Sequence, residues 1–126
     1  YGAAVESIDW ATSVIMKEIE LLGLDENTIV IFTSDNGSLG NVPPPFGGSQ
    51  QLLGGSNFPL RGSKGTTWEG GQRVPALVRW KGKIESGRIC DELLTAMDFY
   101  PTLASICGAT IPQDRVIATA TGACQK

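Results

Sequence analysis

Apolar side chains recur every three or four residues at the start of the chain, which is the spacing of one face of an α-helix. The positions on this face are Val5, Ile8, Thr12 (weakly apolar), Ile15, Ile19 and Leu22. Gly23 comes next and suits the position after a helix, where a left-handed backbone is common. The pattern therefore predicts a helix of about five turns that ends at Gly23.

Two further segments have the pattern of strands. Residues 28–33, TIVIFT, are apolar without alternation, which is typical of a strand buried on both faces in a parallel sheet covered by helices. Residues 74–80 form a second candidate strand, and Pro75 lies near its start, where a proline is tolerated. Between the two strands, residues 37–62 are rich in Gly, Pro, Ser and Asn. A loop of this length in a compact domain is either functional or disordered.

A second helix is predicted after residue 97. Asp98 or a neighbouring residue can cap it, Pro101 suits its first turn, and it should end near Cys107 and Gly108. The order helix, strand, long loop, strand, helix indicates an α/β architecture. In open α/β sheets ligands bind outside the carboxyl ends of the strands, and Asp35 follows the first strand directly.

Composition and charge narrow the functional classes. The chain has 126 residues, of which 41% are hydrophobic, and this suits one modest globular domain. A net charge of −3 without a Lys/Arg cluster does not favour nucleic-acid binding, and no apolar stretch approaches the ~18 residues of a membrane span. The chain has no histidine, which excludes a Ser-His-Asp or Cys-His catalytic device within it.

The three cysteines, Cys90, Cys107 and Cys124, lack the spacing of a metal site. We expect Cys107 to be a small buried hydrophobic residue on its helix. The chain begins at Tyr1, without a methionine and directly on a helical pattern, so we expect it to be a piece of a longer protein.

Asp35 and Asn36 are the first candidates for chemistry. They lie in the motif TSDNG at residues 33–37 and offer a carboxylate and an amide oxygen, which calcium and magnesium accept as ligands. Gly37 permits the backbone bend that would let both side chains reach one ion. The same residues suit an ordinary capped turn. The motif NGS at 36–38 also fits a glycosylation sequon. An asparagine that ligates a buried metal could not accept a glycan, so these two interpretations of Asn36 exclude each other.

Lys64 is the second candidate. It lies between Gly62 and Gly65, so its backbone can approach a ligand closely. A lysine ammonium is a compact charge suited to phosphate or sulfate oxygens. The segment does not match a phosphate-binding P-loop, and a solvated lysine in a flexible loop is the alternative interpretation.

The residues after Lys64 are interpreted as architectural. Glu69 and Arg73 are four residues apart and can pair across one helical turn. Trp68 and Trp80 are interpreted as packing residues.

Four segments together resemble the sulfatase family, and most closely its arylsulfatase and N-acetylgalactosamine-6-sulfatase type. They are residues 1–10, residues 33–37, residues 60–75 (LRGSKGTTWEGGQRVP) and residues 98–103 (DFYPTL). Each motif is weak alone, but Asp-Asn-Gly after an apolar strand followed by Lys-Gly-Thr-Thr-Trp-Glu-Gly-Gly is a specific combination. The order and spacing agree over residues 1–112.

The resemblance implies a sulfuric ester hydrolase with an alkaline-phosphatase-like α/β sandwich, in which helices cover a largely parallel sheet. It assigns Asp35 and Asn36 as ligands of a calcium ion, with magnesium as the second choice, and Lys64 as the catalytic residue that binds the sulfate group. The family's nucleophile is a formylglycine made from a cysteine in Cys-x-Pro-x-Arg. The expected partner is a sulfate-ester small molecule or a sulfated glycan, and the expected location is periplasmic, secreted or lysosomal.

The chain also departs from the family pattern. It contains no Cys-x-Pro-x-Arg motif, no amino-terminal aspartate pair and no active-site histidine, and we expect all of these upstream of Tyr1. Residues 1–117 are therefore interpreted as the distal part of the catalytic domain, and residues 118–126 as an unassigned tail. The isolated chain is expected to be inactive.

Two alternative functions stay open from the sequence. One is a phosphate- or phosphonate-ester hydrolase of the same superfamily, and the other is a non-catalytic sulfatase-like module that binds sulfated glycans. A formylglycine motif upstream favours the sulfatase. The loop at residues 38–59 is predicted to shape the choice of substrate.

Overall fold

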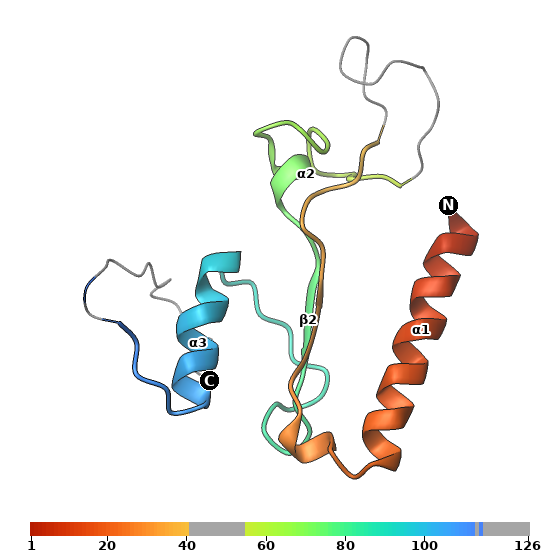
Figure 1. The fold of residues 1–126 in the computed structure, drawn as a ribbon. Helices are drawn as coiled ribbons and strands as arrows, with labels where there is room; N and C mark the ends of the chain where they lie inside the picture. The colour runs from red at the N-terminus through yellow and green to blue at the C-terminus, as the bar shows by residue number, and fades with distance from the viewer. Residues whose placement is uncertain (41–54, 113, 115–126) are drawn as a thin grey trace. The chain divides into compact units, whose positions relative to one another are not determined.

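The computed structural model describes residues 1–40, 55–112 and 114, and the chain divides into two compact units, Tyr1–Ser86 and Gly87–Lys126. The first unit contains helix α1 (Gly2–Leu21), the 3₁₀ turn η1 (Asp25–Asn27), strand β1 (Val30–Thr33), the short helix α2 (Glu69–Gln72) and strand β2 (Ala76–Arg79). The second contains the 3₁₀ turn η2 (Ala96–Asp98) and helix α3 (Phe99–Ile106). Figure 1 shows these elements in chain order. The predicted tail at 118–126 lies outside the described residues.

Helix α1 confirms the prediction from the apolar spacing, and its end confirms the role of Gly23. Gly23 has a φ of +66°, in the left-handed region that glycine adopts without a steric penalty. Its N–H donates to the Glu20 carbonyl at 3.0 Å, and the Leu24 N–H donates to the Ile19 carbonyl at 3.0 Å. These two bonds form a Schellman motif, which satisfies carbonyl groups that the helix end would otherwise leave unpaired.

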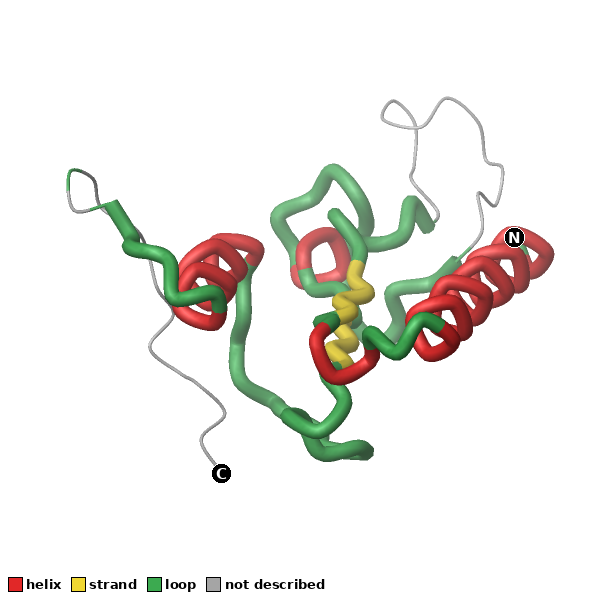
Figure 2. The backbone as a smooth tube through the Cα atoms, turned by 60° about the horizontal axis from the view of Figure 1, so that its bottom comes forward, coloured by secondary structure: helices red, strands yellow, loops and turns green. Residues whose placement is uncertain are grey.

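Strands β1 and β2 pair antiparallel, with Val30 opposite Arg79 and Thr33 opposite Ala76. The expected parallel arrangement is therefore wrong for this pair of strands. A parallel pair needs a crossover that carries the chain back along the strands. Here the chain leaves β1 and re-enters β2 at the same end of the ribbon, where α2 also lies (Figures 1 and 2). The run 28–33 indicated burial but carried no information on strand direction.

The expected burial of the first strand on both faces is also not found. Val30 and Ile31 are half-buried, whereas Phe32 and Thr33 are exposed. The second strand, predicted at 74–80, is shorter than expected and covers Ala76–Arg79. A two-stranded ribbon cannot bury both of its faces without further layers, so its apolar side chains keep much of their surface in solvent.

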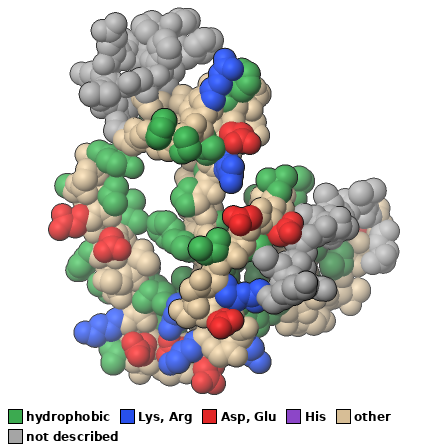
Figure 3. Space-filling view, turned by 180° about the vertical axis from the view of Figure 1, so that it is seen from behind, with side chains coloured by type: hydrophobic (Ala, Val, Ile, Leu, Met, Phe, Trp, Pro, Cys, Tyr) green, Lys and Arg blue, Asp and Glu red, His purple; other side chains and the backbone are tan. Residues whose placement is uncertain are grey.

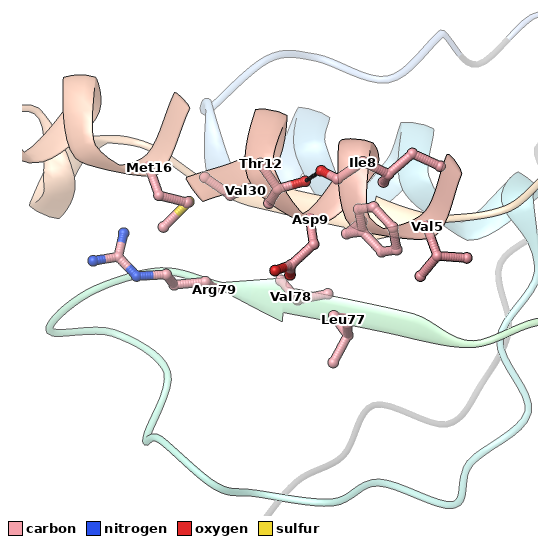
Figure 4. Close-up of a pocket in the computed structure, with 10 residues that line it drawn as sticks. Val5, Ile8, Asp9, Thr12, Met16, Val30, Leu77, Val78 and Arg79 are labelled. Atoms are coloured by element: carbon pink, nitrogen blue, oxygen red, sulfur yellow. Dashed lines mark hydrogen bonds between the residues drawn. The ribbon is translucent and has the colours of Figure 1, made fainter. Parts of the chain in front are cut away.

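The apolar face of α1 lies beside the two strands across an open groove of about 410 Å³ (Figure 4). Val5, Ile8 and Met16 line it from the helix, and Leu77 and Val78 line it from β2. Ile8 remains 53% exposed and Leu77 64% exposed. Val5, Ile8 and Thr12 of the predicted face thus line the groove, whereas Ile15 is 58% exposed and Met16 takes its place. The structure leaves this face largely open.

A charged cluster joins η1 to the end of β2. Asp25 is 6% exposed and accepts hydrogen bonds from Arg79 Nη2 at 2.9 Å and Lys81 Nζ at 3.4 Å. The hydrogen bond from Arg79 lowers the pKa of Asp25 below its ordinary 3.8, burial opposes this shift, and Lys81 adds to the lowering. Because the folded pKa is depressed, the stabilisation is present above the ordinary pKa and is lost as the pH falls through the folded value. Trp80 Nε1 donates to the Glu26 carbonyl at 2.8 Å, which supports its structural interpretation.

In the second unit, helix α3 confirms the prediction for residues 98–107. A capping box formed by Thr95 and Asp98 starts η2, with the Thr95 N–H donating to Asp98 Oδ2 at 2.7 Å. Pro101 is buried in the first turn of α3, and Gly108 follows the helix with a φ of +67°.

The cysteines differ from their expected state. Cys107 carries an exposed free thiol, so its prediction as a buried residue is wrong. It lies at the C-cap, one residue after the end of α3, and the apolar pattern did not show that this position is exposed. Cys90 is disulfide-bonded.

The surface charges and the helix lengths concern the sequence inferences on nucleic-acid binding and on a membrane span. Acidic and basic side chains are interspersed with hydrophobic ones on the face shown in Figure 3. Among the residues that the structure describes, no helix is long and apolar enough to cross a membrane.

Candidate active site

The turn after β1 carries Asp35 and Asn36, as the sequence predicts. Thr33 Oγ1 donates to the Pro75 carbonyl at 3.0 Å and so continues the link between the strands beyond their last pair. Ser34 Oγ then donates to the Asn36 carbonyl at 2.9 Å. The segment is therefore a hydrogen-bonded turn, and its position at the carboxyl end of a strand is where ligands bind in α/β folds.

The two candidate metal ligands differ in burial. Asp35 is exposed and Asn36 is half-buried. Asn36 Nδ2 donates to the Gly37 carbonyl at 3.1 Å, which uses the donor side of the amide and leaves Oδ1 as the atom suited to a cation. A carboxylate and an amide oxygen on adjacent residues fit a hard divalent ion.

This pair would supply two of the roughly six to eight oxygen ligands that calcium takes. Among the described residues, no group of three or more His, Cys, Asp or Glu side chains lies close enough to hold a metal. The donor set thus fits part of a calcium site, and the other ligands would have to come from further groups.

The loop with Lys64 packs directly on the turn that follows β1. The Lys64 N–H donates to the Ser38 carbonyl at 3.0 Å, two residues beyond Asn36. Gly62 and Gly65 on either side have φ values of +89° and +86°, which only glycine adopts readily. The Lys64 side chain is exposed. The structure therefore brings the backbone of this loop to the segment that carries the candidate metal ligands.

Three glycines allow this close approach. The Gly37 N–H donates to the Gly71 carbonyl at 3.0 Å, and the Gly70 N–H donates to the Arg61 carbonyl at 2.7 Å. A Cβ atom on Gly37 would collide with the Gly70 carbonyl oxygen, and one on Gly70 would collide with the Gly62 carbonyl oxygen. Gly37, Gly70 and Gly71 are all buried. Each is therefore required for backbone packing, which the sequence analysis recognised only for the bend at Gly37.

Asn57 is a residue of this junction that the sequence analysis did not single out. Its Oδ1 accepts a hydrogen bond from the Ser38 N–H at 2.8 Å. Its Nδ2 donates to the Ser38 carbonyl at 3.0 Å and to the Gly62 carbonyl at 3.1 Å. An asparagine in a loop rich in Gly, Pro and Ser carries no periodic signal, so only the three-dimensional structure shows these contacts.

The architectural interpretations around α2 are confirmed in part. Arg73 and Glu69 form an ion pair at 3.6 Å, as their spacing predicts, and both side chains are exposed. The Arg61 guanidinium lies 3.8 Å from the centre of the Trp68 ring, a cation–π contact. One face of Trp68 is thus occupied by a neighbouring side chain.

The structure thus places the oxygen-bearing side chains of Asp35 and Asn36, together with the loop that carries Lys64, after the carboxyl end of β1. The family model described as Sulfatase matches residues 1–109, and the chain belongs to the sulfatase family. This confirms the resemblance seen in the motifs.

Named relatives support the same family. The chain is 44% identical to the steryl-sulfatase of Mus musculus over 117 residues, which are 93% of this chain and 18% of that protein. It is 45% identical to arylsulfatase H of Homo sapiens over 118 residues, 93% of this chain and 20% of that protein. It is 42% identical to N-acetylgalactosamine-6-sulfatase of Canis lupus familiaris over 117 residues, 93% of this chain and 21% of that protein. The chain therefore spans about a fifth of the length of these relatives.

A solved structure has a similar fold. The crystal structure of Ps i-CgsB in complex with k-i-k-neocarrahexaose matches with a TM-score of 0.77 and 31% identity, over 91% of this chain and 23% of that chain. The match covers 23% of that chain, so the similarity is to one segment of a larger protein.

Proposed function

We propose that the full-length protein is a sulfatase that hydrolyses sulfate esters, and that this chain supplies the distal part of its catalytic domain within residues 1–117. Asp35 and Asn36 are the proposed calcium ligands, and Lys64 is the proposed sulfate-binding residue. The parent fold proposed is an alkaline-phosphatase-like α/β sandwich. The observation that carries the proposal is the hydrogen bond of 3.0 Å from the Lys64 N–H to the Ser38 carbonyl, because it ties the lysine loop to the turn of the metal ligands.

The chemistry of sulfate esters suits these side chains. The sulfate oxygens carry negative charge, which repels a nucleophile that approaches the sulfur. A positive charge held in place where charge shifts during the reaction lowers this barrier. The Lys64 ammonium would donate to sulfate oxygens and compensate their charge, while Asp35 and Asn36 would hold calcium against the same group. Calcium, when bound, supplies further positive charge as a Lewis acid.

The nucleophile is proposed to lie in the part of the protein upstream of Tyr1. A formylglycine derived from a cysteine is the family's expected group, and none of Cys90, Cys107 and Cys124 lies in the Cys-x-Pro-x-Arg motif that forms it. Within this chain, the residues therefore bind and orient the sulfate and do not attack it.

The substrate class proposed is a sulfate ester of a small alcohol or of a glycan. The names of the relatives include a steroid-directed and a sugar-directed sulfatase, and the similar structure was solved with k-i-k-neocarrahexaose. Either ligand type would have to reach Lys64, whose side chain is exposed.

An assay of the full-length protein with paired esters tests the reaction class. We expect turnover of an aryl sulfate at least about tenfold above that of the matching aryl phosphate, and loss of this turnover on chelation with recovery on addition of calcium. The comparison is kcat/KM for the two esters at one pH. Preference for the phosphate ester would favour a phosphoesterase of the same superfamily, and turnover of neither would favour a binding module.

A further inference from the structure

Asn57 connects the two halves of the proposed site. Its side chain reaches Ser38, which lies two residues after Asn36, and Gly62, which lies two residues before Lys64. The three hydrogen bonds measure 2.8, 3.0 and 3.1 Å. One half-buried side chain thus holds both the segment next to the metal ligands and the segment next to the lysine.

The bonding pattern requires a primary amide. Oδ1 accepts from a backbone N–H, and Nδ2 uses its two hydrogens on two different carbonyls, so both sides of the amide are engaged. An aspartate of the same shape could accept from the Ser38 N–H but could not donate to either carbonyl. Alanine would lose all three bonds and leave part-buried backbone groups without these partners.

Asn57 is itself held in place by its surroundings. The Leu60 N–H donates to the Asn57 carbonyl at 2.7 Å, and the Phe58 N–H donates to Ser56 Oγ at 3.2 Å. The side chain therefore extends from a closed turn. A side chain that is anchored in this way can hold the segments that it binds in fixed positions.

The lysine loop needs such a support. Gly62 and Gly65 flank Lys64 with left-handed backbones, and glycine has the greatest conformational freedom in the unfixed chain. A charge contributes most to catalysis when it is already in position before the reaction. The bond from the Lys64 N–H to the Ser38 carbonyl meets the same oxygen that accepts from Asn57 Nδ2.

We propose that Asn57 is a positioning residue, whose amide fixes the turn of Asp35 and Asn36 and the loop of Lys64 relative to each other. The inference rests on the proposed function, because it assumes that these side chains act on one sulfate group. Asn57 touches backbone atoms only in the contacts described, so its effect reaches the substrate through Lys64 and the metal ligands.

A double-mutant cycle in the full-length protein tests this role. The variants are Asn57→Ala, Lys64→Ala and the double variant, and the matched control is Asn27→Ala, an exposed asparagine of η1. We expect Asn57→Ala to lower kcat/KM for an aryl sulfate by about tenfold to a hundredfold. This is the typical loss when a residue that orients a ligand-binding group without contacting the ligand is removed. In the Lys64→Ala background the same change should cost less than about threefold, since the group that it positions is already absent.

The outcomes separate this inference from the proposed function. If the unaltered protein does not turn over the aryl sulfate, the proposed function fails, and if Lys64→Ala keeps normal turnover, the proposed role of Lys64 fails. Suppose instead that Lys64→Ala loses turnover. The positioning role alone is then overturned if Asn57→Ala has the same kcat/KM as the Asn27→Ala control. It is also overturned if Asn57→Ala lowers kcat/KM by the same factor with and without Lys64. Melting temperatures accompany each measurement, and Asn57→Asp, which keeps the shape and the acceptor, replaces Asn57→Ala if the latter does not fold. Loss of the folded protein in both Asn57 variants would make Asn57 a folding residue and would also overturn the proposal.

Discussion

Replacing Lys64 with alanine in the full-length protein is expected to lower sulfate-ester turnover by about 10²–10³, the typical cost of losing one contact to developing charge. The side chain is exposed, and its flanking glycines offer it little apolar packing. Its removal should therefore leave the fold intact. The measurement is kcat for an aryl sulfate together with the melting temperature of each variant.

Two further variants give this prediction its controls. Lys64→Arg should recover only part of the turnover, because the planar guanidinium is bulkier and directs its donors differently. Lys17→Ala, which removes an exposed lysine from α1, should keep normal turnover. Near-normal activity of Lys64→Ala would mean that Lys64 is a solvated loop residue, as the alternative interpretation of the sequence allows.

Asp35→Ala is expected to cost more activity and more bound calcium than Asn36→Ala. The carboxylate of Asp35 contributes a full negative charge and an oxygen, whereas the amide of Asn36 contributes an oxygen dipole. Losing the carboxylate should weaken metal retention as well as turnover. Turnover and metal content of the two purified full-length variants are measured side by side, with Asp35→Asn as a variant that keeps an oxygen but removes the charge.

The metal assignment has a clear contradicting result. If Asp35→Ala retains both the calcium content and the activity of the unaltered protein, Asp35 is only part of a surface turn. The residues 34–37 would then form only a structural turn, held by the hydrogen bonds of Ser34 and Asn36.

Local patterns in the sequence predicted the helices well. The spacing of apolar residues defines one face of α1, and Gly23 ends it through contacts with residues three to five positions away. Gly108 follows α3 in the same way, and Asp98 lies at the N-cap of α3, although its side chain accepts from Thr95 in the preceding turn and makes no capping hydrogen bond to α3. These signals are local, so they can be seen in the sequence.

Strand direction and burial could not be predicted in the same way. The partner of β1 begins at Ala76, more than forty residues from the end of β1, and an apolar run indicates burial without specifying how its neighbour is oriented. Cys107 shows the same limit, because the sequence places it at the end of α3 but its exposure depends on which elements cover that end.

The residues of the candidate site also differ in whether the sequence could indicate them. Asp35, Asn36 and Lys64 could be proposed from the sequence because their side chains have the chemistry that a cation and an anion require, and the family resemblance gave them expected roles. Asn57, Gly70 and Gly71 were not found, because their contribution is to backbone contacts between segments far apart in the chain. Such contacts leave no periodic or chemical signal in the sequence.

The most direct test is a crystal structure of the full-length protein with calcium and a bound sulfate or sulfate ester. We expect an oxygen of Asp35 and Oδ1 of Asn36 about 2.3–2.6 Å from the calcium ion, and Lys64 Nζ within about 2.7–3.2 Å of a sulfate oxygen. Calcium bound elsewhere, with Lys64 directed into solvent, would contradict the proposed site.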